Sequence, residues 1–285
     1  LATPTANTTN NNVNIDLTIS NASDDIVTTV APAEDNLISA TATGNISTGA
    51  AVLAFAPSTA GDTAAVGTLQ SVEADVVAAS TNDTHSIVIE NTDTGVRTFT
   101  GAALQDNNDI TAGATGNSAT SSLTVASGLD VDESGVGTAS VALNQATAGA
   151  PNTLASADLL VSSSQEIDSA EAVQALNITG TVTGANTTTR IEEIDGATVT
   201  TANSDQASSA TGNTATNSIS SLNTTASITG TAAIANQQSI IPFDGATISA
   251  TTQDSTISVD VGGTFDGAVV SSTVLLSDNS QTSTA

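Results

Sequence analysis

The sequence predicts an all-β fold built from repeats that stack as a β-solenoid, or β-helix. A Thr-Gly-Asn motif recurs among small residues, at 43–45, 115–117 and 211–213. Ser and Thr make up 85 of the 285 residues, whereas Trp, Tyr and Cys are absent and Phe occurs four times. So few large side chains predict a thin core, and a solenoid buries small residues in a narrow interior.

A row of β-sandwich or jelly-roll domains is the alternative all-β arrangement. Sandwich cores are built from larger apolar side chains, carried on strands about 8–12 residues apart. The scarcity of aromatic residues in this chain argues against such cores. The composition therefore favours the solenoid.

The first strand is predicted at 12–20, after a lead-in rich in Thr and Asn, because polar and apolar residues alternate there. We therefore divide the chain into a lead-in at 1–20 and a repetitive β domain at 21–285. A strand of this kind pairs either with its own sheet or with the exposed edge of a neighbouring subunit. Its apolar positions are the candidate assembly residues, Val13, Ile15, Leu17 and Ile19.

The repeat unit is predicted to be about 35 residues long. Asparagines that mark the successive units, spaced 37, 35, 35, 34 and 27 residues apart, are Asn45, Asn82, Asn117, Asn152, Asn186 and Asn213. Gly and Asn tolerate positive φ, so each Thr-Gly-Asn is expected to turn tightly and start a strand. Asp-Gly pairs at 195–196, 244–245 and 266–267 predict further corners. Residues 164–176 are the one stretch with an alternative as two helical turns.

The charge of the chain excludes several classes of partner. There are 29 acidic residues, the only basic ones are Arg97 and Arg190, and the net charge is -27. Nucleic acid binding is excluded because no basic patch can form. Membrane insertion is not expected, because no run of 18 apolar residues exists. We expect divalent cations, cationic surfaces or further copies of the same chain as partners. We read the chain as a processed mature form or a segment of a longer one.

Two heptapeptides and the Asp-Gly-Ala-Thr units carry a resemblance to a known class. Ala-Thr-Gly-Asn-Ser-Ala-Thr at 114–120 and Ala-Thr-Gly-Asn-Thr-Ala-Thr at 210–216 resemble the lysine-poor β-strand-repeat surface and adhesin-like fibre proteins of bacteria. The resemblance covers most of the chain. It implies an extracellular or cell-surface location in a fibre, layer or adhesin, and it supplies no catalytic residues.

Catalytic chemistry has little support in the sequence, so we expect no enzyme. His85 is the only histidine and has no nucleophile motif nearby, so an exposed strand histidine is expected. Zinc of the ordinary type is excluded because His and Cys together number one. Paired acids such as Glu192 with Glu193 are present, but the aromatic residues that stack on sugars are nearly missing.

Calcium is the one candidate cofactor, and none is required. Asp130, Asp132 and Glu133 place carboxylates close together ahead of Gly135, which suits a cation that takes six to eight oxygen ligands. A solvated acidic turn is the alternative interpretation of the same residues.

The sequence thus predicts a structural subunit of an extracellular filament, matrix fibre or surface layer. It would assemble with itself, head to tail, through β-strand contacts. An adhesin, or a solenoid that binds glycan or ice with surface polysaccharide as its partner, is the alternative function. Thr-x-Thr pairs motivate that alternative: Thr41/Thr43, Thr181/Thr183 and Thr187/Thr189.

Overall fold

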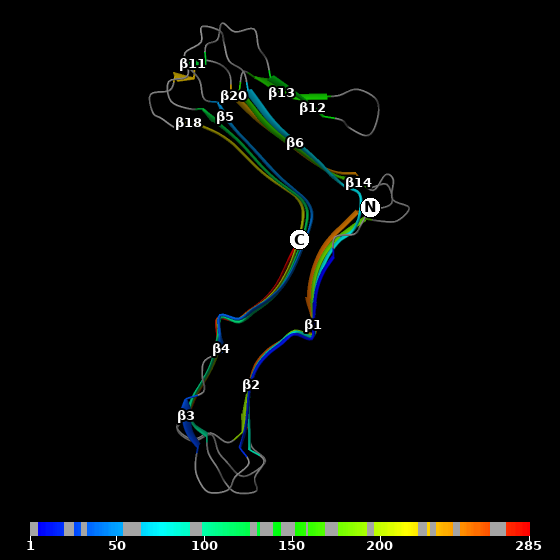
Figure 1. Cartoon of the computed structure of the whole chain (residues 1–285). Coiled ribbons are helices and arrows are strands. Elements are labelled where there is room, and N and C mark those ends of the chain that lie inside the picture. The colour runs from blue at the N-terminus through cyan, green and yellow to red at the C-terminus, as the bar shows by residue number, and fades with distance from the viewer. Residues whose placement is uncertain are drawn as a thin grey trace.

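The computed structural model confirms the predicted fold class (Figure 1). Its regular elements are all strands, and nearly all of them stack in parallel, as in a β-solenoid. It describes residues 5–19, 26–29, 33–53, 64–91, 99–125, 130–131, 139–143, 152–157, 159–168, 176–192, 197–221, 227–228, 232–241, 246–262 and 272–285.

Within the described residues, five parallel sheets follow one another in the same order along the chain, and the last circuit contributes to the first four of them. The first sheet contains β1 (Thr5–Thr9), β7 (Val76–Thr81), β15 (Leu176–Thr183) and β21 (Ala246–Gln253). The second contains β2 (Asn12–Ile19), β8 (Thr84–Asn91), β16 (Asn186–Glu192) and β22 (Thr256–Gly262). The third contains β3 (Ile26–Thr29), β4 (Ala33–Glu34), β9 (Phe99–Asp106), β17 (Thr198–Ala202) and β23 (Thr273–Ser277).

The fourth sheet has the longest strands, β5 (Leu37–Leu53), β10 (Asp109–Val125), β18 (Asp205–Ser221) and the short β24 (Ser280–Thr284). The fifth contains β6 (Ala64–Val72), β14 (Leu159–Asp168) and β20 (Ala232–Ile241). Two smaller pairs complete the described structure: β11 (Asp130–Val131) with β19 (Ser227–Ile228), and β12 (Ala139–Leu143) with β13 (Asn152–Ala157). The last pair is antiparallel.

Each circuit, here called a rung, is much longer than the predicted unit of 35 residues. Thr5, Val77, Thr179 and Ser249 share one register position in the first sheet, so the successive rungs span 72, 102 and 70 residues by subtraction. A spacing of about 35 residues corresponds to roughly half a rung. The sequence period differs because the marker asparagines lie at different places in a rung: Asn45, Asn117 and Asn213 share one register position of the fourth sheet, whereas Asn82 is a corner residue and Asn186 begins β16.

The sheets form two facing walls (Figure 1). The fifth, first and second sheets follow one wall, and the third and fourth follow the other. Apolar side chains fill the space between the walls in three clusters, represented by Ile110 with Ile178, by Ile87 with Val199, and by Leu123 with Val161. Much of this interior is alanine: Ala42, Ala114 and Ala210 stack at one register position. The thin core expected from the composition is therefore present.

The prediction that Thr-Gly-Asn forms a tight turn is wrong. Gly116 and Asn117 lie in the middle of the 17-residue strand β10, and the same motif lies inside β5 and β18. Side chains alternate between inside and outside along β10, except that positions 116 and 117 are both buried. The motif thus shifts the alternation by one residue, which turns Asn117 toward the interior.

Glycine is required at this position because the neighbouring backbones come too close for a side chain. A Cβ atom added to Gly116 would lie 2.5 Å from the carbonyl oxygen of Gly212 and 2.6 Å from Cδ1 of Ile178. A Cβ atom on Gly44, in the same column, would lie 2.6 Å from the carbonyl oxygen of Gly116. The column of glycines therefore marks a close approach and not a turn.

The lead-in at 1–20 contributes β1 and β2, which pair with β7 and β8 as the first strands of their sheets. The helical alternative at 164–176 is wrong at its start, because residues 164–168 belong to β14. The predicted Asp-Gly corners lie outside the described residues.

We predict that Gly116→Ala destabilises the fold, by about 1–3 kcal/mol, because the added methyl group must displace backbone. Gly113→Ala is the matched control in the same strand, since its Cβ atom would meet only the Ser209 hydroxyl, at 3.2 Å. Urea unfolding of both variants measures the difference. Equal stability of the two would contradict the close approach.

Candidate functional site

Two corners recur in every rung, and both place a residue in the left-handed region of φ. The first corner joins the first and second sheets at Asn10, Asn82, Gly184 and Asp254. The second corner joins the third and fourth sheets at Asp35, Asn107, Asn203 and Asp278. Their φ values lie between 50° and 65°, a conformation that Gly, Asn and Asp adopt at the lowest cost. Asx and Gly residues therefore fix the turns, at positions the sequence analysis had not singled out apart from Asn82.

Backbone hydrogen bonds join the corners of successive rungs. At the first corner, the N–H groups of Asn10, Asn82 and Gly184 donate to carbonyls in the next rung, those of Thr81, Thr183 and Gln253. At the second corner, those of Asp35, Asn107 and Asn203 donate in the same way to Asp106, Ala202 and Ser277. These hydrogen bonds therefore fix the register between each corner and the rung that follows it.

Corner side chains add a second link, in which an amide lies against a carboxylate. Asn107 Nδ2 donates to Asp35 Oδ1 at 2.7 Å, and Asn203 Nδ2 donates to Asp106 Oδ1 at 2.8 Å. In both pairs, a donor of one rung faces a charged acceptor of the rung before it. This arrangement offsets the repulsion that stacked carboxylates would otherwise create.

An asparagine ladder runs through the interior at the Thr-Gly-Asn motif. Asn45 Nδ2 donates to Asn117 Oδ1 at 2.9 Å, and Asn117 Nδ2 donates to Asn213 Oδ1 at 2.8 Å. The same amides also reach the opposite wall, where Asn117 Nδ2 donates to the Glu166 carbonyl at 2.9 Å. Asn117 is fully buried, so these bonds satisfy an amide that water cannot reach.

A glutamine ladder on the opposite wall completes the link. Gln238 Nε2 donates to Gln165 Oε1 at 3.0 Å, and Gln165 Nε2 donates to Gln70 Oε1 at 2.9 Å. Gln165 and Gln70 also donate to backbone carbonyls of the fourth sheet, those of Thr214 and Ser118. The two ladders hold the walls together between two apolar clusters. In the sequence, the only sign of these ladders is that Asn and Gln residues recur 72–96 residues apart.

We predict that Asn117→Ala lowers the free energy of unfolding by about 1–3 kcal/mol, because it leaves Asn213 Oδ1 and the Glu166 carbonyl without this donor. Thr120→Ala, at an exposed position of the same strand, is the control and should change little. Chemical denaturation followed by circular dichroism compares them. A neutral Asn117→Ala would show that the ladder does not stabilise the fold.

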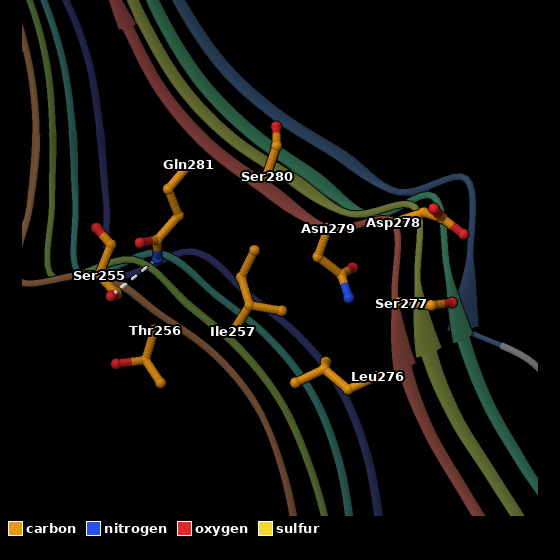
Figure 2. Close-up of a pocket in the computed structure, with 9 residues that line it drawn as sticks. All are labelled: Ser255, Thr256, Ile257, Leu276, Ser277, Asp278, Asn279, Ser280 and Gln281. Atoms are coloured by element: carbon orange, nitrogen blue, oxygen red, sulfur yellow. Dashed lines mark hydrogen bonds between the residues drawn. The ribbon is translucent and has the colours of Figure 1, made fainter.

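In the last rung, β21 to β24, residues that stack on buried positions of the rung before it are themselves exposed. Val274 and Leu276 stack on the buried Val199 and Thr201, yet they are 44% and 50% exposed. Ile257, Leu276 and Asn279 line a hollow of about 480 Å³ at this end (Figure 2). Gln281 crosses the same end and donates from Nε2 to the Ser255 carbonyl at 2.9 Å. We call this surface the open end.

The candidate assembly residues lie at the opposite edge of the stack. Val13, Ile15, Leu17 and Ile19 are in β2, which pairs in parallel with β8 of the same chain. The register aligns Val13 with His85 and Ile15 with Ile87. Because β2 is the outermost strand of the second sheet, its other edge has no partner strand within the described residues. The strand is thus held by its own sheet, and its assembly role stays a prediction.

His85 is buried, so the prediction of an exposed histidine is wrong. The side chain is 1% exposed, and its Nε2 lies 3.2 Å from the carbonyl oxygen of Asp109 across the interior. Its Nδ1 has no hydrogen-bond partner. Burial lowers the pKa of His85, and this outweighs the raising effects of the Asp109 carbonyl and of the Asp109 and Asp83 carboxylates. The histidine is a neutral core residue at neutral pH.

We predict that this histidine makes stability depend on pH. Its folded pKa is lowered, so the unfolded chain binds a proton first as the pH falls through about 6.5. Stability should therefore be full above pH 7 and decline toward pH 5.5. His85→Thr should flatten that decline, since Thr187 fills the same register position in the next rung. Melting temperatures at pH 7.5, 6.5 and 5.5 test this, and an equal slope in both proteins would contradict it.

The calcium prediction falls largely outside the described residues. Asp132 and Glu133 are not described, and Asp130 is described only as the first residue of β11. Among the residues that the structure does describe, no three His, Cys, Asp or Glu side chains are grouped closely enough for a metal ion. The same part of the chain has no helix of a length and hydropathy that could span a membrane. The calcium site stays a prediction.

The three Thr-x-Thr pairs do not share one surface. Thr187 and Thr189 are fully buried, and Thr189 Oγ1 donates to Gln105 Oε1 at 2.9 Å. Thr41 and Thr43 lie on the outer face of the fourth sheet, where Thr43, Thr115 and Thr211 form a column. A hollow of about 330 Å³ lies on this face beside Gly113. Thr181 and Thr183 lie on the outer face of the first sheet, where Thr9, Thr81 and Thr183 form another column.

Comparisons with known proteins add no family to this description. A scan against protein families finds no match, and searches of curated proteins and of solved structures find none either. The chain is therefore described by its own geometry: a parallel strand stack with matched corners, two internal amide ladders and an open end.

Proposed function

We propose that the chain is a structural subunit of an extracellular filament, matrix fibre or surface layer, which assembles with itself through β-strand contacts. One observation carries the proposal: at the open end, columns that are buried within the stack are exposed. Burying apolar surface stabilises an interface by about 25 cal/mol per Å². An uncovered parallel edge also offers backbone groups to a further strand.

Several features support the proposal without depending on the open end. The chain forms a stack in which rungs differ in length but keep their corners and ladders aligned. The absence of an enzymatic role stays a prediction. The location outside the cell rests on the sequence resemblance alone.

A second candidate function is adhesion through the outer face of the fourth sheet. The column of Thr43, Thr115 and Thr211 and the hollow beside Gly113 favour it, because evenly spaced hydroxyls can bind a polysaccharide. Electron micrographs of the purified chain separate the two functions: filaments or sheets support the first, and particles of a single size support the second.

We predict that Leu276→Lys prevents self-association, because it places a charge where apolar columns would be covered. The side chain is half exposed, so the fold should tolerate the change. Thr120→Lys adds the same charge to an exposed position of the central strand β10 and should associate like the wild type. Sedimentation velocity over a concentration series measures this. Equal association of both variants would exclude the open end as the contact.

A further inference from the structure

We propose that the open end binds the β1 to β5 edge of a second copy in one register, in which one corner pair is complementary and the other is repulsive. This inference rests on the proposed self-assembly and goes beyond it. It names the pairs of residues that meet at the joint and predicts how charge regulates their association.

The register follows from the corner bonds. In the described rungs, each first-corner N–H donates to the last residue of the neighbouring strand, as Gly184 does to Gln253. In the last rung the corresponding donor is Asp254, and the matching carbonyl on the first rung of a second copy belongs to Thr9. At the second corner, Asp278 takes the place of Asn203, and the matching carbonyl belongs to Glu34. A joint with these two bonds continues the stack without a shift.

The apolar columns match in this register. Ala250 would meet Ala6 of the second copy, because both belong to the column of Ala78. Ile257 would meet Val13, since both belong to the column of His85 and Thr187. Leu276 would meet Ala33 through the column of Gln105 and Thr201. These three apolar positions of the last rung would thus meet an apolar residue of the second copy, whereas Val274 and Leu275 have no described counterpart in the first rung.

The charges distinguish the two corners. At the first corner, Asp254 would face Asn10 of the second copy, which is the amide and carboxylate pairing that the chain already uses between Asn107 and Asp35. At the second corner, Asp278 would face Asp35, and two carboxylates have no proton donor between them. Like charges in contact oppose association, and dissolved salt screens them.

A further pair of aspartate positions meets in the second sheet. Asp260 and Asp16 share a register position through Val88 and Arg190, so the joint brings these two positions together as well. The joint would leave part of the open end uncovered. β24 pairs only with residues 205–209 of β18, so no described strand of the last rung covers β20, and its Ile234 and Ile240 are exposed. Association of wild-type chains should accordingly be weak at low salt and strengthen as salt is added.

The test compares two variants that remove the same charge from the same rung. Asp278→Asn converts the repulsive pair into an amide and a carboxylate, and Asn already occupies this column at positions 107 and 203 with positive φ. Asp254→Asn removes the carboxylate of the complementary pair at the other corner. Both positions are exposed, so neither change should impair folding.

Sedimentation velocity at 20 mM and 500 mM salt gives the apparent dissociation constants. At low salt Asp278→Asn should associate roughly two- to fivefold more tightly than the wild type, and this gain should shrink at high salt. Asp254→Asn should associate no more tightly than the wild type. Equal tightening by both variants would overturn the proposed register while leaving self-assembly intact. Chains that remain monomeric in every variant and at both salt concentrations would overturn both.

Discussion

Parallel in-register stacking is the constraint on which the rest of this structure depends. Neighbouring strands lie about 4.8 Å apart, so each side chain lies directly against its counterpart in the next rung. A column is therefore stable only when each residue is compatible with the residue at the same register position in the next rung. Alanine on alanine and amide on amide satisfy this condition, as Ala42 with Ala114 and Asn117 with Asn213 show.

The acidic composition is compatible with stacking because amide donors lie against some of the stacked carboxylates. Asn107 donates to Asp35, and Asn203 donates to Asp106, which shares its register position with Glu34. Asp83, which is fully buried, accepts hydrogen bonds from the hydroxyls of Thr8 and Ser80, both at 2.6 Å. Such pairing lets a chain with a net charge of -27 keep aligned rungs.

The same constraint connects the fold to the proposed function. In a stack of aligned columns, one rung can present to a further rung a surface similar to the one it presents to its neighbour. The proposed self-association would then need no separate binding site. Differences between rungs, such as Asn203 against Asp278 in one column, would set the strength of the proposed joint.

The sequence by itself determined the fold class and the thin core. Alternation, abundant Ser and Thr, and the lack of large side chains leave few other ways to bury apolar surface. Only the tertiary structure decided what Thr-Gly-Asn does, that His85 is buried, and that a rung spans 70–102 residues. The physical reason is that Gly and Asn suit both a turn and a close approach. Which one occurs depends on whether a facing wall, far away in the chain, supplies a carbonyl such as that of Glu166.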